Sequence, residues 1–319
     1  MRFIFFLSQE NILLSKFELQ TILRKEPIVE GNLAFAECDK RLDFSCLAMT
    51  KQANIFLFSC EKKEIKEKIR GFNWNKYYEN SFYLSTVHLP KGISKKYLSD
   101  IIYDRINNPK VNVTSPKTVF QLIFSGNIVY ATVRKWINKD RFELRKAHRR
   151  TEHHPTSLHP KLAKALVNMT GIKKGTIIDP FCGSGGIILE ASLLGLRPIG
   201  YDIDNIMLKR ARLNLEDLNL KNFSLKLKDA RDIEKCNYVV TDPPYGISSK
   251  GDKNIHGLYK DFIKELSKKL KKRGVMVFPD NFHYREILEK NSFEILSSFK
   301  WYIHKKMTRN IVVFEPRTH

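Results

Sequence analysis

Short apolar runs separated by polar and basic residues dominate the first 137 residues of the chain. Runs of this length are typical of β-strands, whereas apolar residues that recur every three or four positions are typical of helices. The pattern predicts strands at 2–7, 33–38, 54–59, 82–88, 119–124 and 127–134, and helices at 15–24, 61–69 and 94–106. Gly126-Asn127 joins the last two strands and predicts a hairpin. We therefore expect an α+β module whose strands pair antiparallel.

Strands and helices alternate from residue 156 onwards. The predicted strands are 176–179, 197–202, 223–228, 238–242, 274–279, 293–302 and 309–315, and the predicted helices are 158–169, 186–194, 205–218, 258–272 and 283–290. This alternation predicts an α/β domain with a doubly wound, Rossmann-like parallel sheet. The last two strands follow each other through a short basic turn, which predicts an antiparallel hairpin at the sheet edge. The polar, basic stretch 138–155 is expected to be a linker.

Carboxylates stand at the ends of three successive predicted strands of this sheet. Asp179 precedes the turn Gly183-Ser184-Gly185-Gly186, whose spacing differs from the G-x-G-x-x-G that holds a pyrophosphate. Asp202 can accept hydrogen bonds from two ribose hydroxyls, and Asp229 from an adenine amino group. Ordinary turns with solvated acids would leave this alignment unexplained, so we expect a nucleoside cofactor without phosphates. Cys182 is expected to pack beneath that ligand rather than to act as a nucleophile.

The sequence Asp242-Pro243-Pro244-Tyr245 follows the next apolar strand. An exocyclic amine of a nucleobase is a poor nucleophile because its lone pair is delocalised into the ring. The Asp242 carboxylate and the Pro243 carbonyl can accept from its N–H groups, which aims the lone pair at a methyl donor and gives the proton a route away. Tyr245 can stack on a base rotated out of its helix. A purely structural double-proline turn is the alternative, and carbon-5 methylation is disfavoured because no cysteine follows a proline here.

Composition indicates a polyanionic partner. The 319 residues, enough for two or three domains, include 56 Lys and Arg against 34 Asp and Glu, a formal net charge of +22. Nucleic acid is the favoured partner, and a solubilising surface is the alternative. Basic residues are densest in 91–150, where we expect phosphate contacts. The five cysteines are scattered and form no C-x-x-C pair, which disfavours a zinc ribbon or disulfides and fits the cytoplasm. No apolar run is long enough to cross a membrane.

Two polar clusters in and beside the predicted linker invite further hypotheses. One cluster consists of four histidines: His148, His153, His154 and His159. A metal site is disfavoured for them because no cysteine accompanies them. The other is basic and is expected to contact RNA, with a solvated face as the alternative: Arg145, Lys146, Arg149 and Arg150.

Taken together, these motifs resemble the THUMP-containing tRNA N2-guanine methyltransferases, and most of all the archaeal branch that modifies guanine 10. The matching segments are HRRTEHHPTSLHPKLAKALVNM (148–169), DPFCGSGGIILEA (179–191), YDID (201–204), DPPYG (242–246) and, more loosely, HKKMTRNI (304–311). The resemblance covers the whole length. It implies transfer of one or two methyl groups from S-adenosylmethionine to guanine N2 of tRNA.

The resemblance also implies domains and site residues. The expected domains are a ferredoxin-like segment at 1–50, a THUMP domain at 51–137, the linker at 138–155 and the methyltransferase domain at 156–319. The implied catalytic residues are Asp242, Pro243 and Tyr245. The implied cofactor-binding residues are Thr156, Ser157, Leu158, Asp179, Phe181, Gly183, Gly185, Asp202, Ile203, Asp229, Ala230 and Asp242.

The resemblance implies tRNA as the partner of a chain that is otherwise monomeric, and leaves room for a small zinc-binding activator protein. Three rival functions stay open. The first is methylation of guanine N2 elsewhere in the acceptor stem or in rRNA. The second is amino-methylation of DNA, and the third is RNA binding without catalysis on a methyltransferase scaffold.

Overall fold

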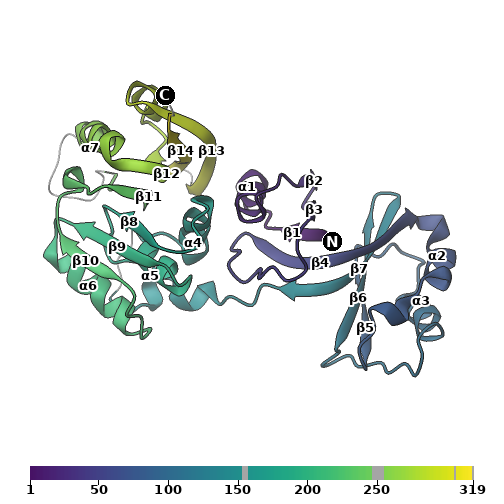
Figure 1. The fold of residues 1–319 in the computed structure, drawn as a ribbon. Helices are drawn as coiled ribbons and strands as arrows, with labels where there is room; N and C mark the ends of the chain where they lie inside the picture. The colour runs from purple at the N-terminus through teal and green to yellow at the C-terminus, as the bar shows by residue number, and fades with distance from the viewer. Residues whose placement is uncertain (153–156, 246–254, 305–306, 318–319) are drawn as a thin grey trace. The chain divides into compact units, whose positions relative to one another are not determined.

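The computed structural model describes residues 1–152, 157–245, 255–304 and 307–317 (Figure 1). The chain forms two compact units. The first consists of residues 1–9, 25–44 and 50–138, and the second of 10–24, 45–49 and 139–319. Each unit has its own seven-stranded sheet.

The sheet of the first unit has the strand order β2-β3-β1-β4-β7-β6-β5. Its strands are β1 (Arg2–Leu7), β2 (Ile28–Glu30), β3 (Leu33–Glu37), β4 (Thr50–Glu61), β5 (Phe82–Val87), β6 (Thr118–Ser125) and β7 (Ile128–Ile137). All six strands predicted in this part of the chain are confirmed. The sequence missed β2, because three residues are too few to show a period. Since β4 pairs with both β1 and β7, a single sheet runs across the predicted boundary at residue 50.

The expected antiparallel pairing is wrong for one pair of strands. β5 runs parallel to β6, from Phe82 opposite Thr118 to Val87 opposite Ile123. The connection between them contains helix α3 (Lys95–Tyr103), and such a crossover brings the chain back in the same direction. The hairpin of β6 and β7 is confirmed, with Gly126 at φ +55° in its turn. Helices α2 (Ile65–Gly71) and α3 contribute to one core with these strands, around the fully buried Trp74.

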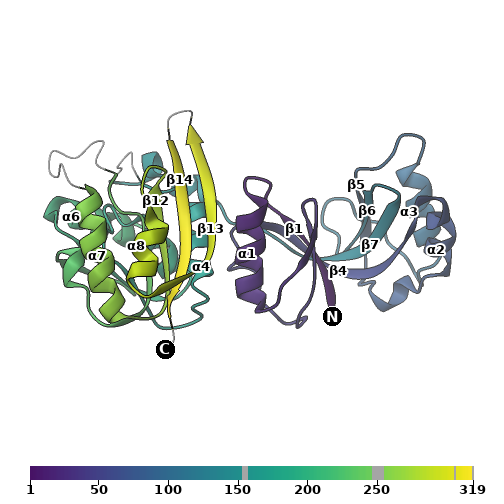
Figure 2. The same cartoon turned by 90° about the horizontal axis from the view of Figure 1, so that it is seen from above.

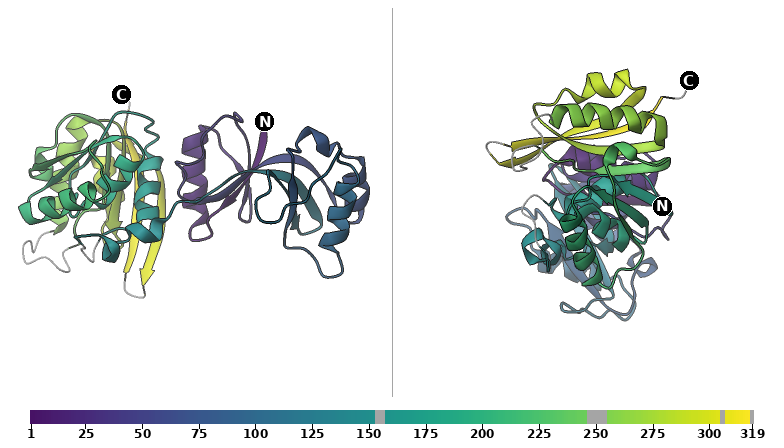
Figure 3. Two further views of the ribbon diagram at one scale, coloured as in Figure 1. Left: turned by 90° about the horizontal axis from the view of Figure 1, so that it is seen from below. Right: turned by 90° about the vertical axis from the view of Figure 1, so that its left-hand side faces the viewer.

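The sheet of the second unit has the order β10-β9-β8-β11-β12-β14-β13. Its strands are β8 (Thr176–Asp179), β9 (Arg197–Asp202), β10 (Ser224–Leu227), β11 (Cys236–Thr241), β12 (Leu270–Pro279), β13 (Phe293–His304) and β14 (Met307–Pro316). The first five strands in this order are parallel, and β14 is antiparallel to both β12 and β13. The long strands β13 and β14 form the hairpin at the sheet edge (Figure 3). The predicted doubly wound sheet with an antiparallel edge hairpin is therefore confirmed.

Helices cover both faces of this second sheet. Residues of α4 (Pro160–Met169) and α5 (Gly186–Leu193) share a core with Val275, Val277 and Ile311, and α6 (Asn205–Glu216) packs on α5. Residues of α7 (Ile255–Lys269) and α8 (Tyr284–Lys290) pack on the other face, along which Figure 2 shows both helices. The predicted helix 258–272 ends earlier than expected, because Leu270 already pairs with β11. Among the described residues no helix is both long and apolar enough to cross a membrane.

Helix α1 (Ile12–Leu23) belongs to the second unit, although it precedes most of the first unit in sequence. The fully buried carboxylate of Glu18 accepts hydrogen bonds from the backbone N–H groups of Ala48 (2.9 Å) and Met49 (2.7 Å) and from Asn168 Nδ2 (2.6 Å). Burial raises the pKa of Glu18. These bonds hold α1 and residues 45–49 to α4, so the predicted segment 1–50 contributes to both units.

Part of the predicted linker is packed into the second unit. It contains two short 3-10 helices, η3 (Phe142–Arg145) and η4 (Ala147–Arg149). Arg145 donates to both carboxylate oxygens of Glu190 at 2.8 and 3.0 Å, and Arg150 is buried. The expected RNA contact is therefore wrong for Arg145 and Arg150, because the Arg145 side chain is only 14% exposed and pairs with Asp140 and Glu190, while Arg150 is buried. Arg149 is exposed and stays a candidate.

Candidate active site

The glycine turn after β8 meets the requirements of a close ligand approach. Gly183 and Gly185 have φ angles of +50° and +85°, which side chains rarely adopt. A Cβ at Gly183 would meet no atom within 4 Å, so this glycine faces open space. A Cβ at Gly185 would lie 3.1 Å from Ala211 Cβ, so this glycine permits close packing between the turn and α6. The turn thus combines an open face with a tightly packed back.

Cys182 lies beneath this turn and is not available as a nucleophile. Its side chain is buried and its N–H donates to Tyr201 O at 2.8 Å. Burial raises the pKa of the Cys182 thiol well above its usual range, so the thiolate does not form near neutrality. A Cβ at Gly200 would lie 2.8 Å from Cys182 Sγ, which shows how closely the sulfur packs on β9. The interpretation of Cys182 as a packing residue is confirmed.

Three carboxylates converge where β9, β8 and β11 end side by side. Asp179 Oδ1 accepts from Thr241 Oγ1 (2.7 Å) and from the N–H of Phe181 (3.2 Å). Burial raises the pKa of Asp179 to about 7, and the negative charges of Asp242 and Asp202 add to this effect. The sequence placed Asp179 and Asp202 at successive strand ends and Asp242 after a later strand, and the strand order brings these three together.

Asp202 supports the glycine turn directly. Its Oδ2 accepts from the N–H of Gly183 (2.9 Å) and its Oδ1 from the N–H of Asp204 (2.9 Å). Burial raises the pKa of Asp202. The next residue, Ile203, exposes 75% of its surface, an unusual position for a large apolar side chain beside a turn. An apolar ligand face packed on Ile203 would remove this exposure.

Asp229 is engaged differently from the sequence expectation. Its carboxylate accepts from Arg231 Nε (3.0 Å) and Nη2 (2.7 Å), and from the N–H of Arg231 (2.8 Å). This pair lowers the pKa of Asp229. An arginine two residues away contacts both carboxylate oxygens in this conformation, so the acceptance from an adenine amino group stays a prediction. Ala230, the neighbour of Asp229, is buried.

The remaining predicted cofactor residues lie around the same turn. Ser157 Oγ is 2.8 Å from Ser184 Oγ, which connects the segment before α4 to the turn. Leu158 is buried in the core shared with α4. Phe181 is half-buried and packs edge-on against Phe262 at 5.2 Å. Thr156 lies outside the described residues.

Asp242 forms a buried cluster with Arg309 and Tyr245. Arg309 Nη1 donates to Asp242 Oδ2 at 3.1 Å, and the two side chains are only 8% and 10% exposed. The hydroxyl of Tyr245 donates to Asp242 Oδ1. Burial raises the pKa of Asp242 to about 7, while the charge of Arg309 counteracts this rise. The guanidinium also lies over the ring of Tyr245, 4.7 Å from its centroid, so a base stacking on Tyr245 would meet this cation.

Sequence reasoning missed Arg309, which lies 67 residues after Asp242. It had been grouped with the basic turn of the C-terminal hairpin. The sequence feature that could have identified it is its position: Arg309 and Asn310 directly precede the apolar run 311–314, and a cation next to a buried strand needs an anionic partner.

The proline turn itself is held from α7. Pro243 is buried, and Pro244 O accepts from the hydroxyl of the fully buried Tyr259 at 2.5 Å. Gly246 lies outside the described residues. A buried carboxylate that is kept partly ionised by one arginine is suited to accept a hydrogen bond and a proton from a weakly acidic N–H group.

A metal centre has no support in the described part of the chain, where no group of three or more His, Cys, Asp or Glu side chains is arranged to hold a metal ion. His159 Nδ1 accepts from the N–H of Lys161 (3.2 Å), and its Nε2 lies 3.4 Å from Glu143. His153 and His154 lie outside the described residues.

Comparison with known proteins shows that this chain is similar to methyltransferases. A family model described as an RMKL-like methyltransferase domain matches residues 147–309. A model described as a DNA methylase matches residues 33–212, a range that ends before Asp242.

Two curated relatives are similar over most of their length. The tRNA (guanine(10)-N2)-dimethyltransferase of Methanothermobacter thermautotrophicus is 30% identical over 97% of this chain and 98% of its own. That of Pyrococcus abyssi is 28% identical over 91% and 89%. Among solved structures, TrmN from Thermus thermophilus has a TM-score of 0.54 at 17% identity, covering 99% of this chain and 100% of its own. A putative methyltransferase complexed with SAH has a TM-score of 0.51 at 14% identity, covering 100% and 98%. These two structures share the fold.

Proposed function

The chain belongs to the family of tRNA (guanine(10)-N2)-dimethyltransferases, and on this premise we propose that it methylates the exocyclic N2 of a guanine in tRNA, with guanosine 10 as the target. One or two methyl groups are transferred, and the cofactor is S-adenosylmethionine. The observation that carries the proposal is the buried contact of Asp242 with Arg309, at the sheet edge where Asp179 and Asp202 also lie.

Asp242 acts as the acceptor for the amino group in this proposal. Guanine N2 carries two protons and a lone pair delocalised into the ring, so an acceptor is needed to localise that lone pair. Asp242 Oδ2 stays paired with Arg309, which favours the ionised form, and Pro243 supplies a second acceptor through its carbonyl. The proton leaves N2 for Asp242 as the new N–C bond forms. We assign Arg309 the role of positioning Asp242 and keeping it ionised.

The residues around the glycine turn fit S-adenosylmethionine, which supplies a methyl group on a positively charged sulfur. The open face at Gly183 admits a ligand without a steric clash. Asp202 would accept from the ribose, Ile203 would cover the adenine, and Ala230 would contact it through its backbone. Asp179 would supply negative charge near the sulfur. Ser157 and Leu158 would border the same ligand, together with Phe181.

The first unit is proposed to bind the tRNA. Its stretch 91–137 carries exposed basic side chains, among them Lys96 on α3, Lys110 on a loop and Lys135 on β7. The ferredoxin-like and THUMP assignments of residues 1–50 and 51–137 are part of this proposal. The zinc-binding activator, the monomeric state and the cytoplasmic location stay predictions.

Nucleoside mass spectrometry of unmodified tRNA after incubation with protein and S-adenosylmethionine tests the function. We expect N2-methylguanosine and N2,N2-dimethylguanosine at position 10 with the wild type, and a loss of about 10²-fold or more in rate with Asp242→Ala. A control is Asp261→Ala, which removes an exposed carboxylate of α7 and should leave the rate unchanged. Methylation of duplex DNA but not of tRNA would contradict the proposal, and so would wild-type turnover by Asp242→Ala.

A further inference from the structure

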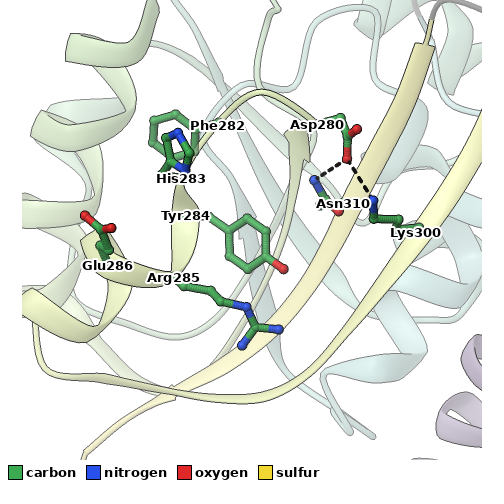
Figure 4. A pocket seen from close by; sticks show the side chains of 8 residues that line it. All are labelled: Asp280, Phe282, His283, Tyr284, Arg285, Glu286, Lys300 and Asn310. Carbon is green, nitrogen blue, oxygen red and sulfur yellow. Dashed lines mark hydrogen bonds and ion pairs between the residues drawn. The ribbon is translucent and has the colours of Figure 1, made fainter.

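A cavity lies in the second unit among residues that the site described above does not use. It has a volume of about 420 Å³ and lies between the end of β12, the start of α8 and strands β13 and β14 (Figure 4). The lining residues used below are Asp280, Phe282, Tyr284, Arg285, Lys300 and Asn310. None of them belongs to the cofactor frame or to the catalytic cluster, so the function proposed above does not use this cavity.

Two connections tie the cavity to the catalytic turn. Phe282 packs edge-on against Tyr259 with ring centroids 4.9 Å apart, and the hydroxyl of Tyr259 donates to Pro244 O. On the opposite side, Asn310 follows Arg309 in β14, and Pro279 pairs with Arg309 in the sheet. The cavity therefore lies at the same sheet edge as Asp242, within two side chains of the turn that contains it.

The lining combines the groups that recognise a nucleotide. Tyr284 stacks on Phe278 at 5.5 Å and an interplanar angle of 10°, so its ring is held in a fixed orientation at the cavity wall. Arg285 and Lys300 bring two positive charges to a lining that also contains the carboxylates of Asp280 and Glu286. Arg285 Nη2 donates to Ser298 Oγ at 3.2 Å, and its guanidinium lies over the ring of Tyr284, 5.6 Å from the centroid. Asp280 and Asn310 offer side-chain acceptors and donors. Aromatic faces for bases and cations for phosphates are the usual elements of single-stranded RNA sites.

The existing contacts inside the cavity are weak enough to be exchanged for a ligand. Lys300 Nζ lies 3.6 Å from Asp280 Oδ1, and both side chains are more than half exposed (Figure 4). Asn310 Nδ2 donates to the same oxygen over 3.3 Å. An exposed ion pair of this kind contributes little, so a phosphate can take over Lys300 at little cost. The volume also falls within the range of small-molecule and nucleotide pockets.

We propose that this cavity binds a nucleotide of the tRNA next to the target guanosine, with its base against Tyr284 and its phosphate against Arg285 and Lys300. The proposal rests on the proposed function, because it assigns the cavity to the same RNA. Holding a neighbouring nucleotide would keep the target base unstacked from it and over Asp242, since a base has to leave its stack to reach an active site of this kind.

The test compares two double variants that each remove two positive charges from the second unit. The cavity variant, Arg285→Gln with Lys300→Gln, removes the arginine and the lysine that line the cavity. The control variant, Lys271→Gln with Lys290→Gln, removes exposed lysines of β12 and α8 outside the cavity. The measurement is the KM for tRNA at several salt concentrations, together with kcat and the affinity for S-adenosylhomocysteine. A third variant, Tyr284→Leu, removes the aromatic face but keeps an apolar side chain on Phe278.

For the cavity variant we expect the slope of log KM against log salt to fall by about 0.7 to 0.9, because the one phosphate held by these two cations is no longer neutralised. The control variant should keep the wild-type slope, and S-adenosylhomocysteine affinity should change in neither. Tyr284→Leu should raise KM about 5-fold or more through lost base stacking. An equal slope in the cavity and control variants would overturn the proposal.

A further arm distinguishes a free nucleotide from a nucleotide of the RNA. Binding of guanosine 5′-monophosphate that is lost in the cavity variant, with an unchanged salt slope for tRNA, would assign the cavity to a free nucleotide and overturn the RNA proposal. Absence of methyl transfer to tRNA by the wild type would instead refute the proposed function itself. The two failures are therefore separable.

Discussion

Replacing Arg309 with glutamine removes the one cation that contacts Asp242 among the described residues. The guanidinium lies 3.1 Å from Asp242 Oδ2, and both side chains are about nine-tenths buried. Burial raises the pKa of Asp242 to about 7, and the charge of Arg309 opposes this rise. An adjacent opposite charge lowers the pKa of a carboxyl group by about 1 to 3. Arg309→Gln should therefore move the acidic limb of the pH–rate profile to higher pH by about that amount.

The size of the effect at neutral pH follows from the ionised fraction of Asp242. Near pH 7 about half of the carboxyl groups are ionised in the wild type, against about one in ten after a displacement of one pH unit and one in a hundred after two. The rate of methyl transfer at pH 7 should fall about 5- to 50-fold for a displacement of one to two pH units and about 500-fold for three, and it should recover as the pH rises. Arg309→Lys keeps the charge and should retain more of the activity.

The assay is single-turnover methylation of tRNA between pH 6 and 9.5, with the melting temperature of each variant as a control for folding. An equal loss at every pH would mean that Arg309 acts through the shape of the site alone. An unchanged profile would refute the electrostatic reasoning altogether.

Further predictions concern the core of the second unit. Asp179→Asn should stabilise the cofactor-free protein at pH 8 by up to about 4 kcal/mol, and hardly at pH 4. Burial raises the pKa of Asp179 to about 7, so the folded protein holds a proton that the unfolded chain has released. The wild type therefore loses stability as the pH rises from about 4 to 7. Thermal melts at both pH values check this, and equal changes would contradict it. Gly200→Ala should cost about 1 to 3 kcal/mol, because its Cβ would lie 2.8 Å from Cys182 Sγ and 2.9 Å from Cys182 Cβ. Partial restoration by Cys182→Gly in the same chain, which removes both atoms, is the check. Glu18→Ala should cost about 3 kcal/mol or more by leaving one N–H of Asn168 and two backbone donors unpaired, and unchanged urea unfolding would refute it.

Local patterns in the sequence determined most of the second sheet and its acidic edge. A parallel strand that is buried on both faces appears in the sequence as a short apolar run. The end of that run marks the carboxyl edge of the sheet, so the sequence alone assigns Asp179, Asp202 and Asp242 to that edge. The motif Asp-Pro-Pro-Tyr carries its chemistry in consecutive residues. Neither inference needs knowledge of which strand lies beside which.

Tertiary structure decided what depends on contacts between distant residues. Arg309 reaches Asp242 only because β14 lies against β12, and α1 joins the second unit through Glu18, 150 residues from Asn168. The cavity at Tyr284 likewise arises from α8 and three strands. Hydrophobic periodicity reports which face of an element is buried but not the element that buries it. The acceptor for the amino group was therefore visible in the sequence, whereas the cation that keeps it ionised was not.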